Sequence, residues 1–253
     1  MKRKLIGVGA AFFAALFLLS SYKLLNWYLD SRQSREEFSR VEALRGATLS
    51  DGISGGADDG AEPPVLGEYL ALYEQNSDFA GWIKIEDTGI DYPVMHSPEE
   101  PDRYLKHNFE GQYSVYGVPY VQSDCDLLTS DNLIVYGHSM NDGSMFTALK
   151  KYRSADFCRE HSLIQFNTRY SRGTYEIVAA FSTTANSGGF AFNAMVNAAD
   201  EEAFNAYMAA CKELTPYEIE AAAEYGDKLL TLATCEYTHS NGRMVVVAKR
   251  LAE

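Results

Sequence analysis

The length and the charge of the chain narrow the classes of protein to which it can belong. Its 253 residues, 46% of them hydrophobic, are enough for one sizeable folded core. The first 45 residues carry eight Lys and Arg against four Asp and Glu, whereas the remaining 208 carry 14 against 31. Nucleic-acid binding needs clustered basic side chains, so this acidic body excludes nucleic acid as a partner.

An uncharged run near the N-terminus predicts a membrane anchor. Leu5–Tyr22 holds 18 residues without a charge, directly after a basic cluster at residues 2–4. As a helix this run would extend roughly 27 Å, close to the ~30 Å hydrocarbon core of a bilayer. We expect a single-pass anchor over residues 5–25, with residues 1–4 cytoplasmic and the remainder extracellular. A cleaved signal peptide is the alternative, although the small-residue cleavage pattern is weak.

Residues 26–64 predict a stalk between the anchor and a folded domain. Ser31–Arg45 has apolar residues at spacings of three, which is compatible with a modest amphipathic helix. Ala47–Pro64 is rich in Gly and Asp and closes with two prolines, a composition typical of a linker. As a flexible coil it would hold its ends roughly 20 to 25 Å apart. We therefore expect the folded domain over residues 65–253.

The pattern of the folded domain is that of short strands at close spacing. After a helix-like segment at Val65–Asn76, the strand-like runs are Trp82–Ile85, Ile90–Met95, Val118–Val121, Asn132–Tyr136, Leu163–Asn167, Thr174–Ser182, Lys228–Thr234 and Met244–Lys249. Helices are expected at Met145–Tyr152 and Asp200–Leu214, the second within the long connection before the last two strands. Eight short strands with few helices predict a mostly β fold, either a barrel or a sandwich.

The last two strand-like runs bring a cysteine close to an arginine. Asn241-Gly242 between them is a sequence favoured in hairpin turns. Antiparallel pairing then puts Cys235 and Arg243 at the same end of neighbouring strands. A lone strand-end cysteine is more often a buried small hydrophobe, but the adjacent positive charge makes Cys235 a candidate nucleophile.

The remaining cysteines give no sign of a metal or redox site. Cys125, Cys158 and Cys211 form no C-x-x-C pair, and we expect neither a metal nor a cofactor. In an exported protein some of these three residues could form a disulfide, whose connectivity the sequence does not define.

A thiol nucleophile needs a proton partner, and two of the five histidines stand out. His138 follows the strand-like run Asn132–Tyr136 at a strand-to-loop corner. His239 lies four residues after Cys235, inside the hairpin loop. Proximity favours His239, whereas a loop tip is a poor place to hold an imidazole within hydrogen-bond reach. From the residues alone both remain candidates.

Several of these motifs together resemble sortases, the cysteine transpeptidases of Gram-positive cell surfaces. Thr231–Cys235 reads TLATC and, with Arg243 downstream, resembles the TLxTC and arginine signature of that family. Asn132–Phe146 is similar to the segment that carries the family's histidine, and Phe79–Met95 resembles the class B branch. The resemblance extends from about Asn76 to Lys249.

The resemblance implies a closed eight-stranded sortase-type β-barrel with peripheral helices, namely one or more N-terminal helices and a helix before the cysteine strand. It implies Cys235 as the nucleophile, His138 as the acid/base and Arg243 as the stabiliser of the oxyanion, without a cofactor. The backbone N–H of Glu236 is a second candidate oxyanion donor by analogy with the family, and Thr234 is expected to support the cysteine.

The resemblance also implies a substrate, although the sequence departs from the family pattern at two positions. Tyr104-Leu105 matches a segment that lines the substrate groove of relatives. However, Ala233 stands where class B members often have Ser, and Pro101 stands where a polar residue is expected. The sorting motif is therefore open between an NPxTN-like and an (N/S)PxTG-like peptide.

The implied activity is cleavage of that motif in a secreted protein, through a thioacyl-enzyme, and transfer to an amine of peptidoglycan or of a lipid II cross-bridge. A pilin-polymerising enzyme with a lysine acceptor would share every catalytic residue. A non-catalytic, membrane-tethered binding domain is the third alternative, and the intact set of catalytic residues argues against it.

Overall fold

The computed structural model describes residues 2–46, 62–184, 188–236 and 241–252. The chain divides into two compact units, Met1–Ser39 and Arg40–Glu253, and each is described by itself.

The N-terminal part of the chain is helical. The helix α1 runs without interruption over Lys2–Leu44, so the anchor and the amphipathic segment expected from the sequence belong to one helix. Within the described ranges, no helix contains an apolar stretch of the length that crossing a bilayer requires. Of the linker expected at Ala47–Pro64, only residues 62–64 are described.

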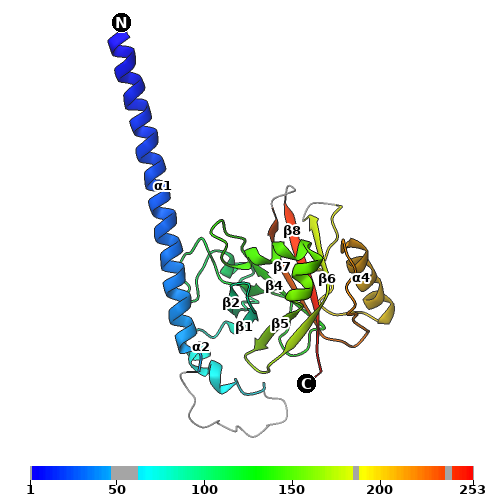
Figure 1. Ribbon diagram of the computed structural model, residues 1–253. Coiled ribbons are helices and arrows are strands. Elements are labelled where there is room, and N and C mark those ends of the chain that lie inside the picture. The colour runs from blue at the N-terminus through cyan, green and yellow to red at the C-terminus, as the bar shows by residue number, and fades with distance from the viewer. Residues whose placement is uncertain (1, 47–61, 185–187, 237–240, 253) are drawn as a thin grey trace. The chain divides into compact units, whose positions relative to one another are not determined.

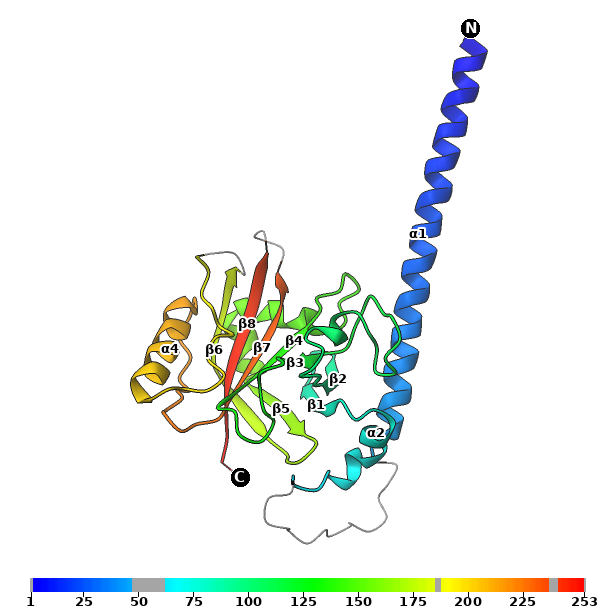
Figure 2. The same cartoon turned by 180° about the vertical axis from the view of Figure 1, so that it is seen from behind.

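The second unit confirms the expected closed eight-stranded barrel, with the strand order β1-β2-β3-β4-β7-β8-β6-β5 (Figures 1 and 2). The strands are β1 (Phe79–Ile85), β2 (Ile90–Met95), β3 (Tyr120–Val121), β4 (Asn132–Gly137), β5 (Leu163–Thr168), β6 (Thr174–Thr184), β7 (Leu229–Glu236) and β8 (Gly242–Arg250). Two of the pairings, β2 with β3 and β4 with β7, are parallel, and the others are antiparallel.

The helices of this unit are short and lie outside the sheet. They are η1 (Gly67–Tyr69), α2 (Leu70–Gln75), η2 (Arg103–Leu105), η3 (Phe146–Arg153), α3 (Ala155–Glu160) and α4 (Glu201–Leu214), where η marks a 3-10 helix. The helix expected at Met145–Tyr152 is therefore a 3-10 helix shifted by one residue. Neither η2 nor α3 was expected from the sequence.

The middle of β8 is apolar on both faces because the barrel interior covers one face and helices cover parts of the other. Met244–Ala248 of β8 is buried at every position. The helix α4 packs against β6, and both views show it on the outer side of the barrel (Figures 1 and 2). Asp200 caps this helix by accepting a hydrogen bond from the N–H of Ala203 at 2.8 Å.

One strand is shorter than expected. The run at Val118–Val121 contributes only Tyr120–Val121 to the sheet. The N–H of Val118 donates instead to the carbonyl of Tyr104 at 3.0 Å, which ties the start of this run to η2.

Candidate active site

Three neighbouring strands bring the expected catalytic residues to one end of the barrel. In the parallel pair of β4 and β7, Gly137 lies opposite Thr234, so Cys235 is the next residue on β7 and His138 is the first residue after β4. In the antiparallel pair of β7 and β8, Cys235 lies opposite Arg243. Because neighbouring strands are about 4.8 Å apart, the backbones of all three residues lie within roughly 10 Å. His239, the alternative histidine, is outside the described residues.

The imidazole of His138 is half-buried and held by a backbone carbonyl. Its Nε2 atom lies 2.6 Å from the carbonyl oxygen of Leu105, on a segment 33 positions earlier in the chain. A carbonyl oxygen only accepts hydrogen bonds, so the proton of this bond is on Nε2. Nδ1 is therefore the ring nitrogen that is left to exchange a proton with a substrate.

The backbone around His138 is tightly packed. Its carbonyl accepts from the N–H of Phe146 at 2.8 Å, which closes the loop that follows the strand. A Cβ atom on Gly137 would lie 2.5 Å from the buried ring of Phe146, so only glycine fits there. The close packing of this corner fixes the direction in which the histidine leaves β4.

Thr234 connects the two strands that carry His138 and Cys235. Its hydroxyl donates to the carbonyl of Gly137 at 2.7 Å, and the residue is buried. The carbonyl belongs to the peptide bond that carries the N–H of His138. Because the hydroxyl is already used within the barrel, it supports the register of the two strand ends rather than offering a contact to a substrate.

We expect Thr234→Val to lower kcat, while Thr231→Val on the same strand leaves kcat near that of the wild type. Thr231 is a matched control because its hydroxyl makes a similar buried bond to β4, donating to Oδ1 of Asn132 at 2.9 Å, away from the site. Each variant removes one hydrogen bond, at a cost of about 0.5–1.5 kcal/mol in the free energy of unfolding. Thermal unfolding and steady-state kinetics on both variants separate stability from positioning. Equal kcat values for the two variants would contradict a specific role for Thr234.

Arg243 is the second residue of β8 and is half-buried. Its guanidinium donates to the carbonyl of Gly242 at 3.0 Å and lies 3.5 Å from the carbonyl of Asn241. Asn241 has a φ of +56°, the left-handed conformation that Asn tolerates better than most residues, as expected for a hairpin turn. A guanidinium has five N–H donors, so donors remain for a negative charge that develops on a substrate.

The other cysteines are excluded as nucleophiles by their surroundings. Cys125, Cys158 and Cys211 are buried and unpaired, so no disulfide joins them. Burial raises the pKa of Cys125 to about 11 and that of Cys211 to about 12, and it also raises the pKa of Cys158. A thiol with a raised pKa stays protonated at neutral pH, and the protonated form is not the nucleophile.

The residues expected to contact the substrate separate into two groups. Leu105 is half-buried beside His138, and Glu236 ends β7 opposite Gly242, next to Cys235. Tyr104, in contrast, is buried, and its hydroxyl donates to Oδ2 of Asp78 at 2.9 Å. Its side chain is therefore part of the interior and does not form a groove surface, which differs from the expectation.

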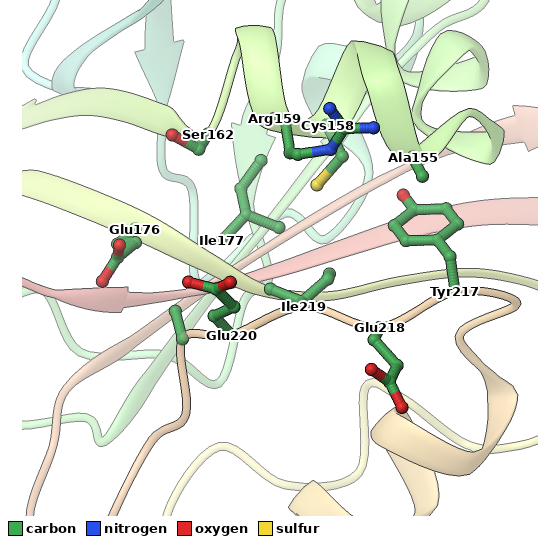
Figure 3. A pocket seen from close by; sticks show the side chains of 11 residues that line it. Ala155, Cys158, Arg159, Ser162, Glu176, Ile177, Tyr217, Glu218, Ile219 and Glu220 are labelled. Atoms are coloured by element: carbon green, nitrogen blue, oxygen red, sulfur yellow. The ribbon is translucent and has the colours of Figure 1, made fainter.

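A pocket of about 370 Å³ lies at the other end of the barrel (Figure 3). Its lining includes Glu176 and Ile177 of β6 together with the carboxylates of Glu218 and Glu220. Along β6 it is Thr183, not Glu176, that pairs with Arg243. At about 3.3 Å per residue the two positions are roughly 23 Å apart, so this pocket is distinct from the candidate active site.

Comparison with known proteins places the chain in a family. The sortase domain matches residues 83–251. Sortase B of Listeria monocytogenes is 31% identical over 188 residues, which are 73% of this chain and 74% of that protein. Sortase B of Staphylococcus aureus is 24% identical over 237 residues, 92% of this chain and 91% of that protein. The crystal structure of sortase B from B. anthracis in complex with AAEK1 superposes with a TM-score of 0.73 at 25% identity, over 89% of this chain and all of that one.

The closed mixed barrel matches that of sortase B structures, and the similarity to sortases identifies the chain as a cysteine transpeptidase. The chain belongs to the sortase family, in the class B branch, whose members anchor proteins to the cell surface. The resemblance recognised in the sequence is thus confirmed, together with the fold that it implied.

Proposed function

We propose that the protein cleaves a C-terminal sorting motif, NPxTN-like or (N/S)PxTG-like, of secreted proteins and transfers the cleaved protein to an amine of the cell wall. Cys235 is the nucleophile, His138 the acid/base and Arg243 the stabiliser of the oxyanion. The proposal is supported above all by the strand register, in which the peptide bonds of these residues are neighbours at one end of three adjacent strands.

The reaction proceeds in two acyl transfers. The thiol of Cys235 gives its proton to His138, and the resulting thiolate attacks the scissile carbonyl. The oxyanion that forms receives hydrogen bonds from Arg243 and from the backbone N–H of Glu236. As the intermediate collapses, the C–N bond breaks and His138 gives a proton to the leaving amine. The incoming amine then attacks the thioester and loses a proton to His138, and the C–S bond breaks.

An amine-dependent ligation assay tests the proposed function. The full chain is incubated with quenched peptides that carry each candidate motif, with and without a short peptide that offers a primary amine. We expect a ligated product, identified by mass spectrometry, only when the amine is present. Hydrolysis without any ligation, or no cleavage of any candidate motif, would overturn the proposal.

The identity of the acceptor distinguishes cell-wall anchoring from the alternative of pilin polymerisation. Both reactions use the same nucleophile and the same thioacyl intermediate, so only the second step differs. Competition between an amine that mimics the peptidoglycan cross-bridge and a lysine-containing pilin peptide decides between them. We expect the cross-bridge amine to be incorporated preferentially.

We expect His138→Ala to abolish ligation and His239→Ala to retain most of it. The reason is that His138 follows the end of β4, directly beside the strand that carries the nucleophile, and that the carbonyl of Leu105 holds its imidazole there. General acid–base catalysis contributes about 10²- to 10⁴-fold, which sets the size of the expected loss. The reverse order of activities would reassign the acid/base.

We further propose that α1 tethers the enzyme to the cell membrane, with the catalytic unit outside the cell. This proposal is supported by the uncharged run at Leu5–Tyr22 and by the basic residues that precede it. Fractionation of cells that express the full chain tests it. Release of the protein into the supernatant by high salt alone would contradict an anchor, because only a peripheral protein is released in this way.

A further inference from the structure

The segment between β2 and β3 contacts His138, the proposed acid/base, although it belongs to none of the three strands that position the catalytic residues. It contains η2, whose last residue is Leu105, and the carbonyl of Leu105 accepts the proton on Nε2 of His138 at 2.6 Å. This backbone oxygen therefore does for the histidine what a side-chain carboxylate does in other catalytic groups: it orients the ring and selects the tautomer.

The position of η2 is fixed by the hydrogen bonds and the burial of Tyr104. The side chain of Tyr104 is buried, and its hydroxyl donates to Oδ2 of Asp78 at 2.9 Å and accepts from Nδ2 of Asn76 at 3.0 Å. The carbonyl of Tyr104 accepts from the N–H of Val118 at 3.0 Å. With both its side chain and its backbone held, Tyr104 leaves the next carbonyl little freedom to move.

Gly117 packs directly against that carbonyl. Its φ is +59°, and a Cβ atom there would lie 2.4 Å from the oxygen of Tyr104 and 2.8 Å from the oxygen of Leu105. The second of these is the oxygen that accepts from His138. Any side chain at position 117 must displace the hydrogen-bond acceptor of the imidazole, and the left-handed φ disfavours it as well.

A second bond joins the same segment to the loop that follows the histidine. The hydroxyl of Tyr116 donates to Oδ2 of Asp142 at 2.9 Å. The other carboxylate oxygen of Asp142 accepts from the N–H and from the hydroxyl of Ser144, which shapes the loop. Residues 104–117 thus hold both the ring of His138 and the loop beyond it.

We propose that Gly117 is a positioning residue for the acid/base, acting through the carbonyl of Leu105 to keep the proton of neutral His138 on Nε2. This inference rests on the proposed role of His138. Nε2–H stays bonded to Leu105 throughout the reaction. Nδ1 alone takes the thiol proton of Cys235 when the thiolate forms and gives that proton to the leaving amine when the C–N bond breaks. It takes another proton from the incoming amine when the new C–N bond forms.

Gly117→Ala tests the proposal, with Gly89→Ala as its matched control. Gly89 also has a left-handed φ, +78°, but a Cβ atom there meets nothing within 4 Å. Both variants therefore carry the strain of the left-handed backbone, and only Gly117→Ala moves the Leu105 carbonyl. We expect Gly117→Ala to lower kcat on the order of 10- to 100-fold with KM within about twofold of the wild type, because small misplacements of a catalytic group have effects of this size. Gly89→Ala keeps the wild-type kcat.

The tautomer of His138 is a second measurement, and it would not change if Gly117 had a purely structural role. In the full chain labelled with ¹⁵N-histidine, the ring nitrogen shifts of neutral His138, assigned by their loss in His138→Gln, show which nitrogen carries the proton. We expect Nε2–H in the wild type and in Gly89→Ala, and a mixture of tautomers in Gly117→Ala. A wild-type His138 protonated on Nδ1 overturns the proposal, as does a Gly117→Ala protein with unchanged tautomer and kcat.

Two features keep this test independent of folding and of the proposed reaction. The wild-type tautomer needs no variant, so the proposal stays open to refutation even if Gly117→Ala does not fold. Tyr116→Phe removes the hydrogen bond from the Tyr116 hydroxyl to Asp142 without adding an atom next to Leu105. We expect it to lower kcat roughly 3- to 10-fold, the effect that corresponds to the loss of one hydrogen bond. An unchanged kcat in Tyr116→Phe would show that the bond to Asp142, in the loop after His138, does not help to position the histidine. If the wild type shows Nε2–H but ligates no peptide, the proposed function fails while the positioning of His138 stands.

Discussion

Replacement of Cys235 by alanine is expected to abolish both cleavage and ligation of the sorting peptide, a loss on the order of 10⁴-fold or more. The alanine variant keeps its backbone place opposite Arg243 in the β7–β8 pair, so the loss reflects chemistry and not folding. The measurement is the release of a quenched peptide, together with thermal unfolding of the variant. Ligation that survives this change would remove Cys235 from the role of nucleophile.

Alkylation of the folded protein supplies the control for that experiment. Because burial raises the pKa of Cys125 to about 11 and that of Cys211 to about 12, these thiols are protonated at pH 8 and react slowly with iodoacetamide. We expect one rapidly modified site per chain in the wild type and none in Cys235→Ala. Cys158→Ala, which removes a buried thiol elsewhere, should leave both the rapid site and the activity unchanged. Rapid alkylation of a second thiol would show that burial does not protect it.

The strands and the β7–β8 hairpin could be predicted because their signals are local, whereas the closure of the barrel was implied only by the resemblance to sortases. Asn241-Gly242 and two apolar runs define the β7–β8 pair within about twenty residues, and the observed register matches that expectation. The helix α3, which was missed, also has a local signal: Ser154 accepts from the N–H of Phe157 as its N-cap and is followed by an acidic first turn. Short elements of this kind are lost because six residues carry too little periodicity.

The supports of His138 could not be predicted because they depend on pairs that are distant in the sequence. The parallel pairing of β4 with β7 joins residues nearly one hundred positions apart, and no local pattern encodes it. The choice between His138 and His239 was therefore open from the residues alone, and only the resemblance to sortases favoured His138. The carbonyl of Leu105 has no side-chain signature at all. The one available signal was Gly117, which looks like an ordinary loop glycine until its neighbours are known.

Replacement of Arg243 by methionine is expected to lower kcat about 10²- to 10³-fold, the loss that follows removal of one oxyanion donor, about 3–4 kcal/mol. Lys249→Met is the matched control, because Lys249 lies on the same strand at the opposite end, where it pairs with Leu229. Arg243→Lys separates two roles of the guanidinium. A lysine keeps the positive charge that favours the thiolate but lacks the planar array of donors, so we expect near-normal alkylation of Cys235 with kcat still reduced. Full recovery of kcat by lysine would mean that Arg243 acts through its charge alone, and the oxyanion would then depend on the backbone N–H of Glu236.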